Sequence, residues 1–162
     1  MNLTSEHKLK LTTNELITSY QNKNFDLAIK QALSIIKKYP KHITSIKILG
    51  SVYEQTDRLN EALEANQKVL KINSKDPESF ANLGIIFLKL GKLKDAEINL
   101  RQALILKPEF ILALYNLGNT LMEIGNLEEA ETNFKRCIEL NPNFIEAYIN
   151  LANTQSENHK FQ

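Results

Sequence analysis

The sequence predicts an all-α solenoid of stacked helix-turn-helix repeats. Three observations predict it: similar segments recur every 34 residues, glycine and proline recur at fixed places in them, and apolar residues recur at helical spacing inside them. The segment that begins at Gly84 aligns with the segment that begins at Gly118. Alanine alone fills one column of the repeat: Ala28, Ala62, Ala96 and Ala130. A single helical hairpin cannot bury its own apolar face, so neighbouring hairpins must stack.

The apolar spacing and the turn residues predict nine helices, paired into four hairpins and one half repeat. The expected ranges are 9–22, 25–38, 43–55, 59–72, 77–89, 93–106, 111–123, 127–140 and 145–157. We expect an N-terminal tail over 1–8 and one repeat domain over 9–162. Its repeats should run over about 9–42, 43–76, 77–110 and 111–144, with a half repeat over 145–162.

Turn residues separate the two helices of each hairpin. Gly91 and Gly125 stand between two apolar stretches, where a left-handed residue must end the first helix. Asp57 takes this place one repeat earlier and tolerates the same conformation. Capping residues also mark the starts of two helices.

Asp76 before Pro77 is typical of a helix N-cap followed by proline at the first helical position. Asn126, with Glu129 three residues later, resembles a capping box. These residues predict that the third hairpin begins at residue 77 and that the second helix of the fourth hairpin begins at residue 127.

Three glycines lie inside helical patterns, where glycine costs about 1 kcal/mol relative to alanine. They are Gly50, Gly84 and Gly118. Close approach of a neighbouring helix would offset this cost. We expect the alanine column to supply the small partner surface for that approach.

Composition and charge exclude several function classes. Twenty Lys and Arg against 19 Asp and Glu leave a net charge of +1, which does not favour nucleic acid or an anionic membrane. No apolar run approaches the roughly 20 residues that cross a bilayer. The single cysteine, Cys137, excludes an internal disulfide and is expected in the core. We therefore expect a cytoplasmic protein without nucleic-acid or membrane partners.

Catalytic and metal-binding patterns are missing from the sequence. His7, His42 and His159 are scattered, and no second ligand stands at metal spacing from any of them. No glycine-rich phosphate loop and no nucleophile elbow is present. We expect no metal, no cofactor and no catalysis within these residues.

The columns of the repeat resemble those of the tetratricopeptide repeat over nearly the whole chain. The third repeat shows the pattern as Phe80, Leu83, Gly84, Phe87, Ala96, Leu100, Ala103 and Pro108. The resemblance implies a right-handed superhelix whose first helices line a concave face. It also implies a protein or peptide ligand bound there without catalysis.

The groove positions of the family fall on polar and apolar residues of the first helices. The resemblance assigns ten of them to peptide binding: Lys47, Asn82, Ile85, Lys89, Tyr115, Asn116, Asn119, Ile149, Asn150 and Asn153. One asparagine column among them is similar to the ladder in the repeat arms of O-linked N-acetylglucosamine transferases. A carboxamide can pair with the C=O and the N–H of a peptide. Solvated helix residues are the alternative interpretation, and both stay open here.

A different groove chemistry of the family is not favoured. Relatives that clamp the acidic tails of heat-shock chaperones use lysine, arginine and asparagine across three repeats. Lys47 and Asn82 fit that pattern, but the other positions hold Ser51, Leu112 and Asn116. The acidic residues near the groove favour a basic or neutral ligand.

The leading hypothesis is a non-catalytic interaction scaffold that binds an extended peptide or a partner helix in its concave groove. The alternative is the substrate-recruiting segment of a larger enzyme, a glycosyltransferase or sulfotransferase, in which tethering lets weak groove binding suffice. The sequence ends within a repeat, which favours a longer protein. In the other interpretation, the last helix is itself the cap. The sequence does not identify the ligand, the oligomeric state or the pathway.

Overall fold

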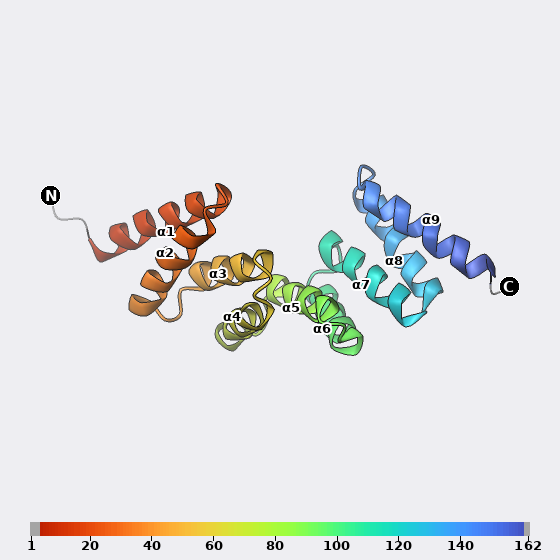
Figure 1. Cartoon of the computed structure of the whole chain (residues 1–162), viewed down its shortest axis with the longest axis horizontal. Helices are drawn as coiled ribbons and strands as arrows, with labels where there is room; N and C mark the ends of the chain where they lie inside the picture. The colour runs from red at the N-terminus through yellow and green to blue at the C-terminus, as the bar shows by residue number, and fades with distance from the viewer. Residues whose placement is uncertain (1–3, 161–162) are drawn as a thin grey trace. The chain divides into compact units, whose positions relative to one another are not determined.

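The computed structural model describes residues 4–160, and the side chains of residues 4–158. Over this range the chain forms nine helices and no strand, as an all-α solenoid of helical repeats (Figure 1). The predicted fold class is confirmed. The helices are α1 (Ser5–Gln21), α2 (Phe25–Lys38), α3 (Ile43–Gln55), α4 (Leu59–Ile72), α5 (Pro77–Lys89), α6 (Leu93–Leu106), α7 (Ile111–Ile124), α8 (Leu127–Leu140) and α9 (Ile145–Lys160).

The predicted helix ranges agree with these bounds except near the two ends of the chain and at the end of α7. Helix α1 begins at Ser5, so residues 5–8 of the expected tail are helical. The cause is Thr4, whose hydroxyl oxygen accepts a hydrogen bond from the backbone N–H of His7 at 3.3 Å. This cap satisfies one of the donors that a helix N-terminus leaves open.

The helices divide into two compact units, residues 1–74 and residues 75–162. In the N-terminal unit, α1 packs on α2, α2 packs on α3, and α3 packs on α4. One buried cluster of this unit lies between α3 and α4, where Ile46, Ala65 and Val69 meet. At the C-terminal end of α3, Gln55 Nε2 donates a hydrogen bond to the Tyr20 hydroxyl of α1 at 2.8 Å.

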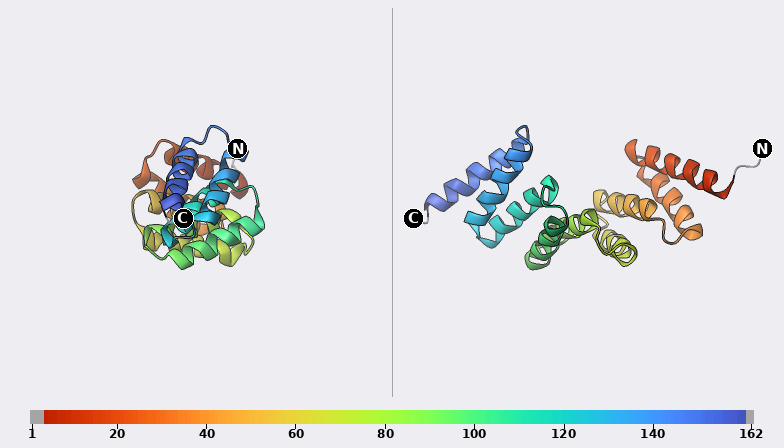
Figure 2. Two further views of the ribbon diagram at one scale, coloured as in Figure 1. Left: turned by 90° about the vertical axis from the view of Figure 1, so that its right-hand side faces the viewer. Right: turned by 180° about the vertical axis from the view of Figure 1, so that it is seen from behind.

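The C-terminal unit contains the hairpins α5/α6 and α7/α8 and the single helix α9. Helix α7 packs on both α6 and α8, and α9 packs on α8. The views of Figures 1 and 2 show α8 and α9 side by side. One core cluster joins α6, α7 and α8 through Leu100, Leu117, Leu121 and Phe134, all of them buried.

The turns inside the hairpins have the predicted left-handed residues. The backbone φ is +69° at Gly91, +89° at Gly125 and 58° at Asp57. Lys23 takes the same place in the first hairpin with φ 56°, which the sequence did not signal. At the start of the third hairpin, the Asp76 carboxylate caps α5 as predicted and accepts a hydrogen bond from Ser79 N at 2.8 Å.

Close packing at the helical glycines is confirmed, but the expected partner surface is wrong. A Cβ on Gly84 would lie 2.5 Å from Leu100 Cγ, and one on Gly118 would lie 2.6 Å from Phe134 Cε1. Large side chains therefore fill the space that these glycines leave. All four alanines of the column are fully buried, and the Ala96 carbonyl oxygen is among the three atoms nearest to the Gly84 Cβ position, at 3.2 Å.

Candidate functional site

The ten predicted groove residues lie on the first helices of the hairpins and on α9. Lys47 is on α3 in the N-terminal unit, where it is half-buried. The other nine belong to the C-terminal unit and form the candidate site: Asn82, Ile85, Lys89, Tyr115, Asn116, Asn119, Ile149, Asn150 and Asn153.

The asparagine column is half-buried on all three helices. Asn82, Asn116 and Asn150 take the same repeat position on α5, α7 and α9. Asn116 Nδ2 donates to the Leu112 carbonyl, one turn earlier in α7, at 2.7 Å. A carboxamide has two N–H donors and an acceptor oxygen, so this bond occupies one donor of Asn116.

Asn150 joins α9 to α7. Its Nδ2 donates to Asn119 Oδ1 at 2.7 Å and to the Tyr115 hydroxyl at 3.1 Å. These two bonds use both N–H donors of the carboxamide. What Asn150 has to offer a ligand is therefore its acceptor oxygen.

Tyr115 is as much a core residue as a groove residue. Its ring centroid lies 4.8 Å from that of Phe144 and 6.0 Å from that of Phe134, both at tilted angles that aromatic pairs favour. The packing of this half-buried ring fixes the position of the hydroxyl that Asn150 contacts. Sequence reasoning assigned Tyr115 to the ligand and did not anticipate this cluster of Tyr115, Asn119 and Asn150.

Other predicted residues reach solvent. Lys89 and Asn153 are exposed, Ile85 is half-buried, and the Ile149 side chain is 53% exposed. Ile145 and Tyr148 of α9 are also exposed, at 68% and 47%. Together with Ile149 they form the α9 stripe. Ile145 and Tyr148 were not predicted as groove residues, although they lie four and one residues before Ile149, a spacing that includes one helix turn.

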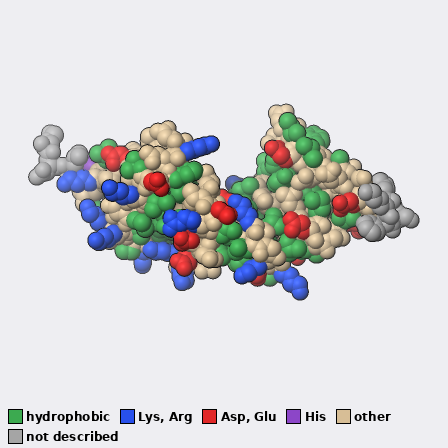
Figure 3. All heavy atoms as spheres, in the orientation of Figure 1, with side chains coloured by type: hydrophobic (Ala, Val, Ile, Leu, Met, Phe, Trp, Pro, Cys, Tyr) green, Lys and Arg blue, Asp and Glu red, His purple; other side chains and the backbone are tan. Residues whose placement is uncertain are grey.

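Charge differs between the two units although the whole chain is nearly neutral. Residues 75–162 contain nine Lys and Arg against 12 Asp and Glu, and residues 1–74 contain 11 against seven. On the face in Figure 3, Lys and Arg gather over the N-terminal unit. The candidate site therefore lies on the acidic unit.

Cys137 lies in the core. It is fully buried on α8, and this burial raises the pKa of its thiol to about 11. A thiol with such a pKa stays protonated at neutral pH, whereas thiol chemistry requires the thiolate.

His42 caps α3. Its Nδ1 lies 3.4 Å from the backbone N of Ser45 and 2.8 Å from the Ser45 hydroxyl. Among the described residues, no group of three or more His, Cys, Asp or Glu side chains is placed to hold a metal ion. The side chain of His159 lies outside the described residues.

None of the described helices has the length and apolar character that a membrane span requires.

Solved structures with the same fold include MamA, YrrB and a repeat domain of RPAP3. MamA superposes with a TM-score of 0.80 at 22% identity, over 91% of this chain and 81% of that one. YrrB, described as a tetratricopeptide repeat protein with an unusual peptide-binding site, gives 0.75 at 22%, over 91% and 76%. The first repeat domain of Spaghetti (RPAP3), bound to the HSP90 peptide SRMEEVD, gives 0.69 at 24%, over 71% and 91%.

Sequence comparison identifies the repeats directly. No curated protein gives a significant match to the chain. Models of the tetratricopeptide repeat match residues 48–76, 77–110, 111–144 and 133–162. These matches are continuous from residue 48 to residue 162, and two of them begin where α5 and α7 begin, at residues 77 and 111. The chain belongs to the tetratricopeptide repeat family.

Proposed function

We propose that this chain is a non-catalytic protein-interaction module. Its ligand is a segment of a partner protein that lies across α5, α7 and α9 of the C-terminal unit. The observation that carries the proposal is the cluster of Tyr115, Asn119 and Asn150, which ties α7 to α9 beside the exposed Ile149.

The cluster favours binding because it holds the surface in place before the ligand arrives. Ordering side chains at an interface costs about 0.5 to 1.5 kcal/mol for each flexible one. Asn150 and Tyr115 are already held by hydrogen bonds and ring packing. Their contribution to that cost is therefore small.

Polar contacts alone do not hold a peptide on this surface. A hydrogen bond contributes about 1 kcal/mol net, against an association cost of about 4 to 15 kcal/mol. Apolar burial must supply the rest, at about 25 cal/mol for each Å² removed from water. Among the apolar groove residues Ile85, Tyr115 and Ile149, Ile149 is the most exposed, at 53%. We assign it the role of anchor for the ligand.

The hydrogen-bond acceptor of Asn150 and the negative charge of the unit favour one class of ligand. Asn150 offers an oxygen, and the unit carries an excess of acidic residues, with Glu123, Glu146 and Glu157 all exposed. Peptide N–H groups and basic side chains match such a surface. The ligand is therefore a neutral or basic segment, in contrast to the acidic peptide bound to RPAP3.

Relatives of the same fold support peptide binding as the class of activity. YrrB is described by a peptide-binding site, and the RPAP3 repeat domain was solved with a peptide. Their identity to this chain is too low to transfer a ligand. They show what the fold can hold.

The test selects peptides from a random phage-displayed library on the immobilised chain and measures the best binder by calorimetry. Ile149→Asp should weaken it at least tenfold, which is about 1.4 kcal/mol. Ile98→Asp is the matched control, since Ile98 is 65% exposed on α6, the second helix of its hairpin. This control should change affinity less than twofold.

A second variant tests the asparagine ladder separately. Asn116 bonds only within its own helix, so Asn116→Ala removes a ladder position without breaking the tie between α7 and α9. We expect a threefold to tenfold loss of affinity. Full binding by Ile149→Asp would contradict the proposed site, whereas full binding by Asn116→Ala alone would reject only the ladder.

A further inference from the structure

The first hairpin is open at a position where the other repeats are closed. Ser45, Ser79, Ala113 and Ala147 share one repeat position, and each is fully buried. The equivalent residue of α1 is Thr12, 33 residues before Ser45, and it is exposed. In α7 and α9 this residue packs on the second helix of the preceding hairpin, α6 or α8, whereas Thr12 of α1 lines an open space beside α2.

A cleft of about 580 Å³ occupies this space between α1 and α2. Leu9 and Ile35 line it with apolar surface, and Thr12 lies along it. The end of the cleft is fixed by a hydrogen bond of 3.0 Å between the hydroxyls of Ser5 and Tyr39. Its volume is within the roughly 300 to 1,000 Å³ range of ligand pockets.

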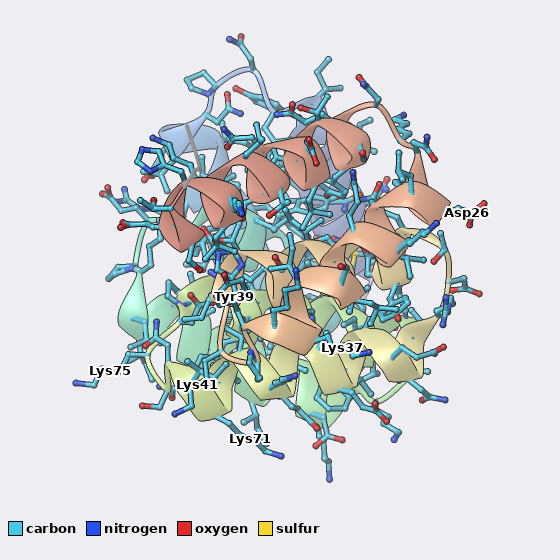
Figure 4. All side chains as sticks on the ribbon, turned by 90° about the vertical axis from the view of Figure 1, so that its left-hand side faces the viewer. Asp26, Lys37, Tyr39, Lys41, Lys71 and Lys75 are labelled. Atoms are coloured by element: carbon cyan, nitrogen blue, oxygen red, sulfur yellow. The ribbon has the colours of Figure 1, made fainter. Side chains whose placement is uncertain are left out.

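A second cavity of about 510 Å³ shares Leu9, Lys38 and Tyr39 with the first and continues along residues 40–42. The two cavities together form one continuous surface, which we name the α1/α2 cleft. Figure 4 shows Lys37, Tyr39 and Lys41 around the C-terminal end of α2, beside this surface.

The cleft carries unpaired positive charge. Lys8, Lys38 and Lys41 line it, all three are exposed, and none forms an ion pair within the described part of the chain. Residues 27–53 contain five lysines and no acidic residue. Glu15 is the one acidic residue of the lining, and it lies seven residues, or about 10 Å, along α1 from Lys8.

An acceptor in the lining lacks a donor. Gln31 lines the cleft, and its Oε1 is buried without a hydrogen-bond partner among the described residues. Such a group costs about 1 to 3 kcal/mol when it stays unsatisfied. An N–H donor that enters the cleft and meets the rotated carboxamide would remove this cost.

We propose that the α1/α2 cleft is a second binding site, for an acidic segment of a partner protein that inserts one apolar side chain. The side chain packs on Leu9 and Ile35, carboxylates meet Lys8, Lys38 and Lys41, and a backbone N–H reaches Gln31. A free phosphate matches only the lysines, because it has neither an apolar group nor an N–H donor. The site is distinct from the acidic surface of the C-terminal unit and independent of the function proposed for it.

The probe is an amidated nonapeptide with one leucine between two runs of four glutamates, titrated by calorimetry into the whole chain. We expect saturable binding that weakens with salt, because added ions screen the carboxylate and lysine charges. Replacing the leucine of the probe by serine should weaken binding at least threefold. An oligothymidylate of nine nucleotides should bind no better than that serine probe.

Adjacent lysines give a matched pair of variants. Lys38→Glu reverses a charge that lines both cavities, whereas Lys37→Glu makes the same change next to it, outside both linings. The first should weaken the leucine probe at least tenfold and the second less than threefold. Thr12→Trp, at an exposed position, should fill the cleft and abolish binding while circular dichroism shows a helical fold.

Several results would overturn the inference. Three of them are the absence of saturable binding at about 1 mM peptide, equal effects of Lys37→Glu and Lys38→Glu, and tighter binding of the oligothymidylate than of the leucine probe. The Ile149→Asp variant should bind this probe as well as wild type does. If it does not, the acidic peptide occupies the C-terminal unit and the second site is refuted.

Discussion

At the scale of single residues, the helical glycines predict a measurable packing cost. A Cβ at Gly118 would lie 2.6 Å from Phe134 Cε1 and 2.8 Å from its Cζ, and Phe134 is fully buried. Gly118→Ala should gain up to about 1 kcal/mol of helix propensity. The forced shift of the ring costs about 1 to 3 kcal/mol, so we expect a net loss in urea unfolding.

Gly50→Ala is the control for this substitution. Its Cβ would lie 3.2 Å from Ala65 Cβ and 3.3 Å from Asn66 Nδ2, distances that a small adjustment relieves. The gain in propensity then nearly offsets the strain, and stability should change by less than about 0.5 kcal/mol. Equal midpoints for the two variants would show that Phe134 moves freely, against the packing described here.

Residues with a local role were readable from the sequence, and residues with a role between helices were not. Gly91 and Asp76 act within four residues of their own position, so residue type alone predicted a left-handed turn and a cap. Asn150 bonds Tyr115 and Asn119, 35 and 31 residues away. That cluster depends on the distance between two helices and on rotamers, which a spacing pattern does not contain.

At the scale of helices, an arginine joins the second helices of successive repeats. Arg101 Nη1 of α6 lies 2.7 Å from Glu129 Oε1 of α8, and Arg101 Nε lies 2.8 Å from Glu97 Oε1. The hydrogen bond from Arg101, together with its charge, lowers the pKa of Glu129 below its usual value. Both side chains are more than one third exposed, so solvent screening limits the value of the pair.

Glu129→Gln should lower the free energy of unfolding by no more than about 1 kcal/mol at pH 7. The pKa of Glu129 is lower in the folded state, so its contribution is present above the unfolded pKa of about 4.3 and is lost on acidification. The difference from wild type should therefore be constant between about pH 7 and 5 and shrink below about pH 4. Urea titrations at several pH values measure it.

Glu109→Gln controls for the removal of a surface charge. Glu109 is 68% exposed and pairs with Arg136 at 3.2 Å. This contact is longer and more exposed to solvent than the pair of Arg101 and Glu129. Its removal should change stability less than Glu129→Gln does. If the Glu129 difference instead grew as the pH fell, the direction given for its pKa would be wrong.

The boundaries of whole helices were the most predictable feature of this chain. The 34-residue period locates every second helix, and α2, α4, α6 and α8 begin and end where the sequence predicts. Helix α1 was predicted too short because Thr4 lies outside the repeated pattern. The α1/α2 cleft was missed because Thr12 fits the repeat in polarity, and a spacing pattern does not show whether another helix packs on that residue.

At the scale of the whole chain, the division into two compact units predicts local stability. Each repeat mainly contacts its neighbours, so stability in such arrays is a sum of local terms. The core of Leu117, Leu121 and Phe134 lies in the C-terminal unit, and the α1/α2 cleft lies in the N-terminal unit. Amide hydrogen exchange should therefore be slowest in α7 and α8 and faster in the first half of α1.

Gly118→Ala tests this division. In hydrogen exchange followed by mass spectrometry, the variant should speed exchange in α7 and α8, because the substitution disturbs the core around Phe134. Peptides from α1 and α2 should exchange as in wild type, because no residue of that hairpin belongs to this core. Equal acceleration along the whole chain would show that it opens as one cooperative body, and stability would then not be a local sum.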